Sequence, residues 1–89
     1  DRIVPNSAFE AIVETSDEWI RSRSGIERRH FAAEGQMTSD LAARAARAAL
    51  ADAGIGADAI DAIIVATSTP DLTFPSVATM VQADLKMTR

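Results

Sequence analysis

Hydrophobic residues recur every three or four positions along much of the chain, which is the spacing of one face of a helix. The first stretch of this kind begins at Asn6 or Ser7, after a short extended lead, and Ser7 with Glu10 fits a capping box. Its apolar stripe consists of Ala8, Phe9, Ile12 and Val13. The pattern predicts a first helix that packs through this stripe.

The longest periodic stretch predicts a helix that Thr38 or Ser39 caps and that runs to about Ala53, where Gly54 ends it. Its expected buried stripe is rich in alanine and consists of Leu41, Ala42, Ala45, Ala46, Ala49, Leu50 and Ala53. Small side chains on this stripe let the helix lie close to a sheet or to another helix. A last helix is expected to begin with Ser76 as its cap, and its apolar side consists of Val77, Met80, Val81 and Leu85.

Two other stretches have the patterns of strands. Residues 26–31 alternate, with Ile26, Arg28 and His30 on one side and Glu27, Arg29 and Phe31 on the other. Neither side is cleanly apolar, which indicates an edge strand or an extended loop. Residues 61–67 are almost continuously apolar, which is typical of a central strand covered on both faces. Because the chain offers such a strand at most one weak partner, the pattern predicts an α/β fold that is incomplete in residues 1–89, one segment of a larger domain.

The stretch from Thr15 to Gly25 contains the only tryptophan of the chain. Thr15 and Glu18 fit a capping box, and Gly25 is expected to end this helix. Because residues four apart share a helical face, Thr15, Trp19 and Arg23 line up along one side. Such a stripe can stack on a flat ring and pair with phosphate. A lone tryptophan on a short helix is more typical of a core anchor, so spacing alone favours the core interpretation and leaves the other open.

Composition excludes several classes of function. The net charge of −4 argues against a general binder of nucleic acid or of anionic membranes, although Arg21, Arg23, Arg28 and Arg29 leave room for a local anion site. No apolar run approaches the roughly 20 residues of a membrane span. The chain has no cysteine, so it contains no thiolate metal site and no cysteine nucleophile. Its one histidine, His30, cannot form a multi-histidine metal centre and is interpreted as a polar surface residue, so we expect no metal.

Motifs for phosphate binding or nucleophilic catalysis are not found in the sequence. There is no glycine-rich phosphate loop, no Walker lysine and no recognisable Ser/His/Asp set. Because the chain does not begin with Met, we expect it to be a piece of something longer. Spacing and composition alone therefore predict an α/β segment with one candidate binding site for a flat ring and a phosphate. They do not identify a reaction.

A series of short strings nevertheless forms a recognisable order along the chain. They are Thr-Ser-Asp-Glu-Trp-Ile at 15–20, Arg-Ser-Gly-Ile at 23–26, Glu-Arg-Arg at 27–29, Ser-Asp-Leu-Ala at 39–42, Ile-Ile-Val-Ala-Thr at 63–67, Thr-Pro-Asp at 69–71 and Phe-Pro-Ser at 74–76. Together they resemble the amino-terminal part of β-ketoacyl–acyl carrier protein synthase III over nearly the whole chain. The resemblance implies part of the N-terminal half of a thiolase-like, αβαβα-layered fold that lacks its first strand.

The resemblance also implies an activity for the full-length parent. That family joins an acyl group from acyl-CoA to malonyl–acyl carrier protein, releases CO2 and CoA, and so starts fatty acid biosynthesis. CoA enters as part of the substrate, no cofactor stays bound, and the enzyme is expected to be a cytoplasmic homodimer. The catalytic cysteine, histidine and asparagine of the family match no position of this chain, which should be inactive alone.

The resemblance also implies roles for individual residues of this chain. Trp19 and Arg23 match the tryptophan and arginine that sandwich the adenine of CoA, and Thr15 matches a threonine that touches the same ring. Arg28 is expected near the phosphate end. Phe74 matches a phenylalanine at the tip of a loop that reaches the partner subunit and lines its acyl pocket. The resemblance thus reverses the core interpretation of the tryptophan.

Three departures from the family pattern accompany this resemblance. Ser24 stands where threonine is usual, Pro5 replaces a small polar residue, and Lys86 stands where glycine is common after leucine. Two alternatives remain open at this point. One is a synthase III-like acyltransferase of secondary metabolism, and the other is a binding or interaction domain with no enzymatic activity.

Overall fold

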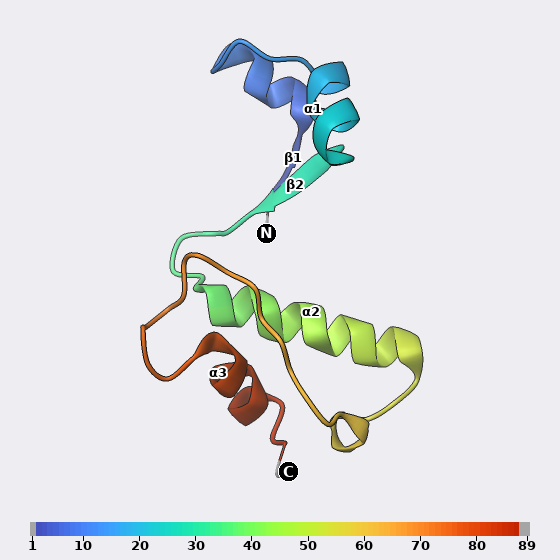
Figure 1. The fold of residues 1–89 in the computed structure, drawn as a ribbon, viewed down its shortest axis with the longest axis vertical. Coiled ribbons are helices and arrows are strands. Elements are labelled where there is room, and N and C mark those ends of the chain that lie inside the picture. The colour runs from blue at the N-terminus through green and yellow to red at the C-terminus, as the bar shows by residue number, and fades with distance from the viewer. Residues whose placement is uncertain (1, 88–89) are drawn as a thin grey trace. The chain divides into compact units, whose positions relative to one another are not determined.

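The computed structural model describes residues 2–87 and divides the chain into two compact units, Asp1–Glu34 and Gly35–Arg89 (Figure 1). In the first unit, strand β1 (Arg2–Pro5) pairs antiparallel with strand β2 (Arg28–Phe31), and Arg2 lies opposite Phe31. Between the strands lie a 3₁₀ helix, η1 (Asn6–Ala11), and helix α1 (Asp17–Ser24). The alternation at 26–31 therefore predicted an edge strand correctly, whereas the partner strand β1 was expected only as an extended lead.

The first helix differs from its prediction because Asn6 has another role. Its Nδ2 donates hydrogen bonds to Asp17 Oδ1 (3.0 Å) and to the carbonyl of Ile26 (2.6 Å), and the residue is 1% exposed. The expected capping box is wrong: η1 has Pro5 at its N-cap with no side-chain cap bond, and Glu10 accepts instead from the amide of Asp17 at 3.3 Å. Asn6 thus ties the start of η1 to α1 and to the approach to β2.

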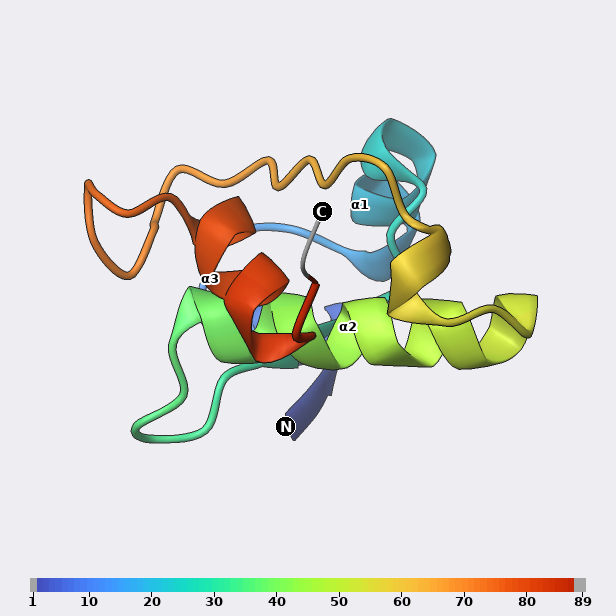
Figure 2. The same cartoon turned by 90° about the horizontal axis from the view of Figure 1, so that it is seen from below.

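The second unit contains helix α2 (Thr38–Ala53), a 3₁₀ turn η2 (Ala57–Ala59) and helix α3 (Val77–Asp84), with α3 alongside α2 (Figure 2). Its core is formed by Ala43, Val77 and Val81, which are 1–4% exposed. Gly54, at φ 71°, ends α2 as predicted, but the predicted cap at Thr38 or Ser39 is wrong, because the helix begins at Thr38 and its N-cap is Met37. Ser76 caps α3 by accepting the amide of Thr79 at 3.2 Å, also as predicted.

The buried face of α2 is rotated relative to the prediction. Ala43, absent from the expected stripe, is its most buried residue, because α3 packs on that side. Ala45, Ala49 and Ala53 are exposed. Several residues of the predicted stripe instead line an open apolar groove of about 300 Å³, formed by Ala46, Ala49, Leu50, Ala53, Ile55, Ile60, Ala62, Ile63, Val81, Leu85 and Met87.

The strand expected at residues 61–67 is not formed. This stretch is extended, and Figure 2 shows it running over the helices of its unit, but within residues 2–87 it pairs with no strand. Ile63 and Val65 pack against the core, while Ile64 between them is 92% exposed. A strand exists only with a hydrogen-bonded partner, so an apolar strand sequence without one remains an extended segment with an open face.

The end of α3 has an unusual backbone. Lys86 adopts φ 58°, the left-handed region that favours glycine. Its amide donates to the carbonyl of Ala83 and the amide of Met87 donates to that of Gln82, both at 3.1 Å, which is a Schellman motif. Lys86, which stands where the family commonly has glycine, therefore occupies a backbone conformation that glycine adopts without strain.

Candidate functional site

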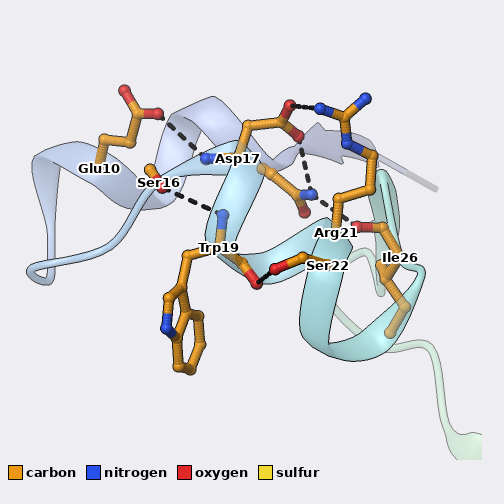
Figure 3. A network of polar contacts seen from close by, with 8 residues as sticks. Glu10, Ser16, Asp17, Trp19, Arg21, Ser22 and Ile26 are labelled. Carbon is orange, nitrogen blue, oxygen red and sulfur yellow. Dashed lines mark hydrogen bonds and ion pairs between the residues drawn. The ribbon is translucent and has the colours of Figure 1, made fainter.

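Helix α1 positions the tryptophan, and its cap lies one residue later than predicted. Ser16, not Thr15, is the N-cap, because its side chain accepts the amide of Trp19 at 3.1 Å (Figure 3). Gly25, at φ 74°, ends the helix as expected. Asp17 and Glu18 lie in the first turn, where their negative charge complements the helix dipole. Thr15 is therefore outside the helix, and the expected helical stripe is not continuous through it.

Trp19 is 57% exposed and its indole projects away from the polar network of α1 (Figure 3). The guanidinium of Arg23, one turn later, lies over the ring with its carbon 5.6 Å from the ring centre. That distance is within the range of a cation–π interaction. Arg21, in contrast, is held by an ion pair with Asp17 at 3.5 Å. Within this unit, Trp19 and Arg23 thus form an exposed stacking pair and not a core anchor.

An open groove of about 440 Å³ lies beside the tryptophan within the first unit. It is lined by Phe9, Val13, Glu14, Thr15, Trp19, Ile20, Arg29 and Phe31. Two of the lining residues, Phe9 and Phe31, form an aromatic pair whose ring centroids are 6.0 Å apart. The Oγ1 atom of Thr15 is buried and has no hydrogen-bond partner among residues 2–87. The groove is thus bounded by the indole of Trp19 and by Thr15, whose hydroxyl is buried behind the groove surface.

Arg29 lines this groove, although the sequence indicated it only as one of four arginines that leave room for an anion site and the family resemblance pointed to Arg28. Successive residues of a strand point to opposite faces, so Arg29 and Phe31 share one face of β2 and Arg28 takes the other. Arg28 instead pairs with Glu27 at 3.8 Å, and both side chains are more than half exposed. The alternation in the sequence already contained this signal, because Phe31 is the apolar residue of the face that Arg29 shares.

Phe74 belongs to the second unit, and its place is described within that unit alone. It lies on the loop between the extended segment and α3, and it is 85% exposed. Leu72, nearby on the same loop, is 54% exposed. Both large apolar side chains of this short loop are thus left outside the core of the second unit.

No group of three or more His, Cys, Asp or Glu residues within 2–87 is arranged to hold a metal ion. Among the helices of the same residues, none has both the length and the apolar character needed to cross a bilayer.

Comparison with known proteins gives close relatives over the whole chain. No protein-family model matches it. The chain is 81% identical over 89 residues to beta-ketoacyl-[acyl-carrier-protein] synthase III of Cereibacter sphaeroides (strain ATCC 17025 / ATH 2.4.3), covering 100% of this chain and 28% of that protein. It is 76% identical over 88 residues to the protein of the same name from Ruegeria pomeroyi, covering 99% of this chain and 27% of the relative. The chain thus spans little more than a quarter of the length of these curated relatives.

Solved structures agree with this result. The synthase III of Thermus thermophilus matches with a TM-score of 0.69 and 46% identity, covering 97% of this chain and 27% of that one. The 3-oxoacyl-[acyl-carrier-protein] synthase III of Aquifex aeolicus VF5 matches with a TM-score of 0.67 and 44% identity, covering 97% and 28%. The resemblance seen in the sequence is confirmed, and so is the partial α/β, thiolase-like fold.

Proposed function

We propose that this chain is a segment of a β-ketoacyl–acyl carrier protein synthase III, from the N-terminal half of the enzyme. The full-length parent would condense an acyl group from acyl-CoA with malonyl–acyl carrier protein and release CO2 and CoA. The observation that carries this proposal is the 81% identity to such a synthase along all 89 residues. Both compact units then belong to one larger thiolase-like domain.

The groove beside Trp19 is proposed to bind the adenine of CoA. The indole offers a stacking face, Arg23 a planar cation, and Thr15 a buried hydroxyl without a partner in the described chain. A base held between two flat groups needs two stacking spacings, together about 7–8 Å. Because Arg23 lies 5.6 Å from the ring centre, its side chain has to swing outward by roughly 2 Å to admit the base.

The phosphates of CoA need cationic partners near the adenine. Arg28 is the residue that the family resemblance suggests, and Arg29 is the one that lines the groove. An arginine can pair with phosphate through two parallel hydrogen bonds. We therefore assign the phosphate contact to Arg29 first and keep Arg28, on the opposite face of β2, as the alternative.

The reacting groups are proposed to lie in the rest of the parent. The chain contains no cysteine, so the nucleophile that the family acylates has to come from outside it, as do the histidine and asparagine that assist decarboxylation. CoA acts as part of a substrate and no cofactor remains bound. We further propose a homodimer in the cytoplasm, in which Phe74 lines the acyl pocket of the partner subunit.

A stand-alone binding domain is the less favoured proposal. Ile64 is 92% exposed in the middle of an apolar extended stretch, and a groove of about 300 Å³ on the second unit is lined entirely by apolar residues. An isolated domain would leave these surfaces free to associate. Both are explained if further strands of the parent pair with residues 61–67 and other layers of the parent cover the two faces of the resulting sheet.

The test is an assay of the purified full-length parent with acetyl-CoA and malonyl–acyl carrier protein, following 3-oxoacyl–acyl carrier protein and CO2. Formation of both products in equal amounts is expected, and omission of either substrate is the control. A product formed only with an acceptor other than malonyl–acyl carrier protein would favour the acyltransferase of secondary metabolism. No acyl transfer to any acceptor would contradict both enzymatic proposals.

A further inference from the structure

The carboxylate of Asp71 holds the first turn of α2 from a distant part of the chain. Its Oδ1 accepts the backbone amide of Ser39 at 2.8 Å, and its Oδ2 accepts the hydroxyl of the same residue at 2.6 Å. Both oxygens of one half-buried carboxylate are thus engaged with a single residue 32 positions earlier. Hydrogen bonds with an ionised acceptor are shorter and stronger than neutral ones, which fits these distances.

The sequence around α2 explains why a distant carboxylate is needed there. Met37, at the N-cap of α2, makes no side-chain cap bond, and Asp40 accepts the amide of Met37 at 2.9 Å. Asp71 therefore supplies an acceptor that the helix start lacks, and the helix dipole favours its negative charge. The hydrogen bonds from Ser39 lower the pKa of the Asp71 carboxyl below its ordinary value near 3.8.

A second bond fastens the same segment to α2. Thr38 Oγ1 donates to the carbonyl of Thr69 at 2.5 Å, next to the Ser39 contact. The amide of Thr69 in turn donates to Thr67 Oγ1 at 3.1 Å, which stiffens the segment itself. The stretch that leaves the extended segment is thus attached to α2 at two successive residues of the helix.

The far end of the loop is fixed on the same packed core. Ser76 caps α3, and Val77, directly after it, is 3% exposed and packs with Ala43 of α2. Residues 72–75 therefore form a short loop between two anchors, one at Asp71 and one at Ser76. Its apolar side chains remain outside the core, since Phe74 is 85% exposed.

We infer that Asp71 is a positioning residue that sets the place of Phe74 through its paired hydrogen bonds to Ser39. The inference rests on the proposed function, in which Phe74 lines the acyl pocket of the partner subunit. Removing the carboxylate frees one end of the loop and lets the phenyl ring shift. The consequence is a change in the preference among acyl-CoA primers, which a merely structural cap would not produce.

The experiment compares primers on the full-length parent and its Asp71→Ala, Ser39→Ala and Phe74→Ala variants. The measured quantity is the ratio of kcat/KM for a short acyl-CoA to that for a longer one. Each single variant is expected to shift this ratio in the same direction, on the order of tenfold, the discrimination that about one methylene of pocket contact provides. In the Phe74→Ala background, Asp71→Ala is expected to add no further shift, because it acts through the ring.

Two further variants separate positioning from a general loss of stability. Asp71→Asn can accept the Ser39 amide and donate to its hydroxyl, so it is expected to restore most of the wild-type ratio. Asp52→Ala removes an exposed carboxylate from the other end of α2 and is expected to leave the ratio unchanged. A lower melting temperature of Asp71→Ala with an unchanged primer ratio, or full additivity with Phe74→Ala, would overturn the inference.

Hydrogen exchange at residues 72–76 tests the positioning role of Asp71 independently of the proposed enzymatic activity. Asp71→Ala and Ser39→Ala are expected to speed exchange in this loop while α3 keeps its protection. If the wild-type parent lacks condensing activity but the loop loosens, the proposed function fails and the positioning role of Asp71 stands. Unchanged exchange in the loop would overturn the positioning role, whatever the enzyme does.

Discussion

The guanidinium carbon of Arg23 lies 5.6 Å from the centre of the Trp19 ring, on a helix that leaves the tryptophan 57% exposed. The two side chains are one helical turn apart, and no polar bond joins them within the described chain. An exposed cation over an exposed indole contributes only about 0.5–1 kcal/mol to stability. The pair therefore contributes little to the stability of the fold, and both side chains remain exposed for the proposed stacking on adenine.

Arg29 and Arg28 form a matched pair for testing the phosphate contact. Arg29→Gln in the full-length parent is expected to raise KM for acyl-CoA, because Arg29 lines the groove beside Trp19. Arg28→Gln removes the same charge from the other face of β2 and is expected to have a smaller effect. Steady-state kinetics at two salt concentrations measure KM for acyl-CoA in both variants. A larger rise for Arg28→Gln would move the phosphate contact to that residue.

Asn6 is expected to be the polar residue whose loss costs the first unit most. Asn6→Ala removes the bonds to the carboxylate of Asp17 and to the carbonyl of the partly buried Ile26, and the free energy of unfolding should fall by about 2 kcal/mol. Chemical denaturation of the parent measures this change. Ser7→Ala, at the exposed neighbouring position, is the control and should change stability by less than about 0.5 kcal/mol. Equal effects of the two variants would show that the Asn6 contacts contribute little.

Lys86 offers a stabilising substitution. Because its φ is 58°, Lys86→Gly should relieve a left-handed conformation that costs an L-residue roughly 1–2 kcal/mol, and stability should rise by about 1 kcal/mol. Lys86→Ala keeps the Cβ atom and should give no such gain. The comparison of melting temperatures for the two variants is the measurement. A gain with alanine equal to that with glycine would attribute the effect to the lost charge.

The lowered pKa of Asp71 predicts the direction in which the stability of the protein changes with pH. Its pKa in the folded protein lies below its ordinary value near 3.8, so its contribution to stability is fully present above that value and is lost as the pH falls through the folded pKa. The stability difference between wild type and Asp71→Asn should therefore be constant above about pH 5 and shrink toward lower pH. Denaturation between pH 3 and 7 tests this. A difference that grows on acidification would contradict the assignment.

Local signals in the sequence predicted the carboxyl ends of α1 and α2 and the N-cap of α3, but not the N-caps of η1, α1 and α2. Gly25 and Gly54 end their helices in the left-handed conformation, and Ser76 caps α3, because each of these effects depends on a few neighbouring residues. Ser16 displaced Thr15 as a cap, since two adjacent hydroxyl residues cannot be ranked by pattern. The role of Asn6 depends on contacts 11 and 20 residues away, which no local pattern contains.

Longer-range features were predicted in part. The alternation at 26–31 indicated the strand and contained the signal for Arg29, but only its pairing with β1 showed which face bounds a groove. The apolar run at 61–67 predicted a strand that needs neighbours, and within residues 2–87 those neighbours are lacking. Ala43 was missed because, in an alanine-rich helix, the buried face depends on where α3 packs.

The central claim is that Trp19 binds the adenine of CoA, and a comparison of two acyl donors tests it most directly. In the full-length parent, Trp19→Ala should raise KM for acetyl-CoA roughly 5- to 150-fold, equivalent to the loss of about 1–3 kcal/mol of stacking. KM for acetyl-pantetheine, which lacks the adenine nucleotide, should stay unchanged, and so should kcat for both donors. An equal rise of KM for both donors, or no rise for acetyl-CoA, would contradict the account.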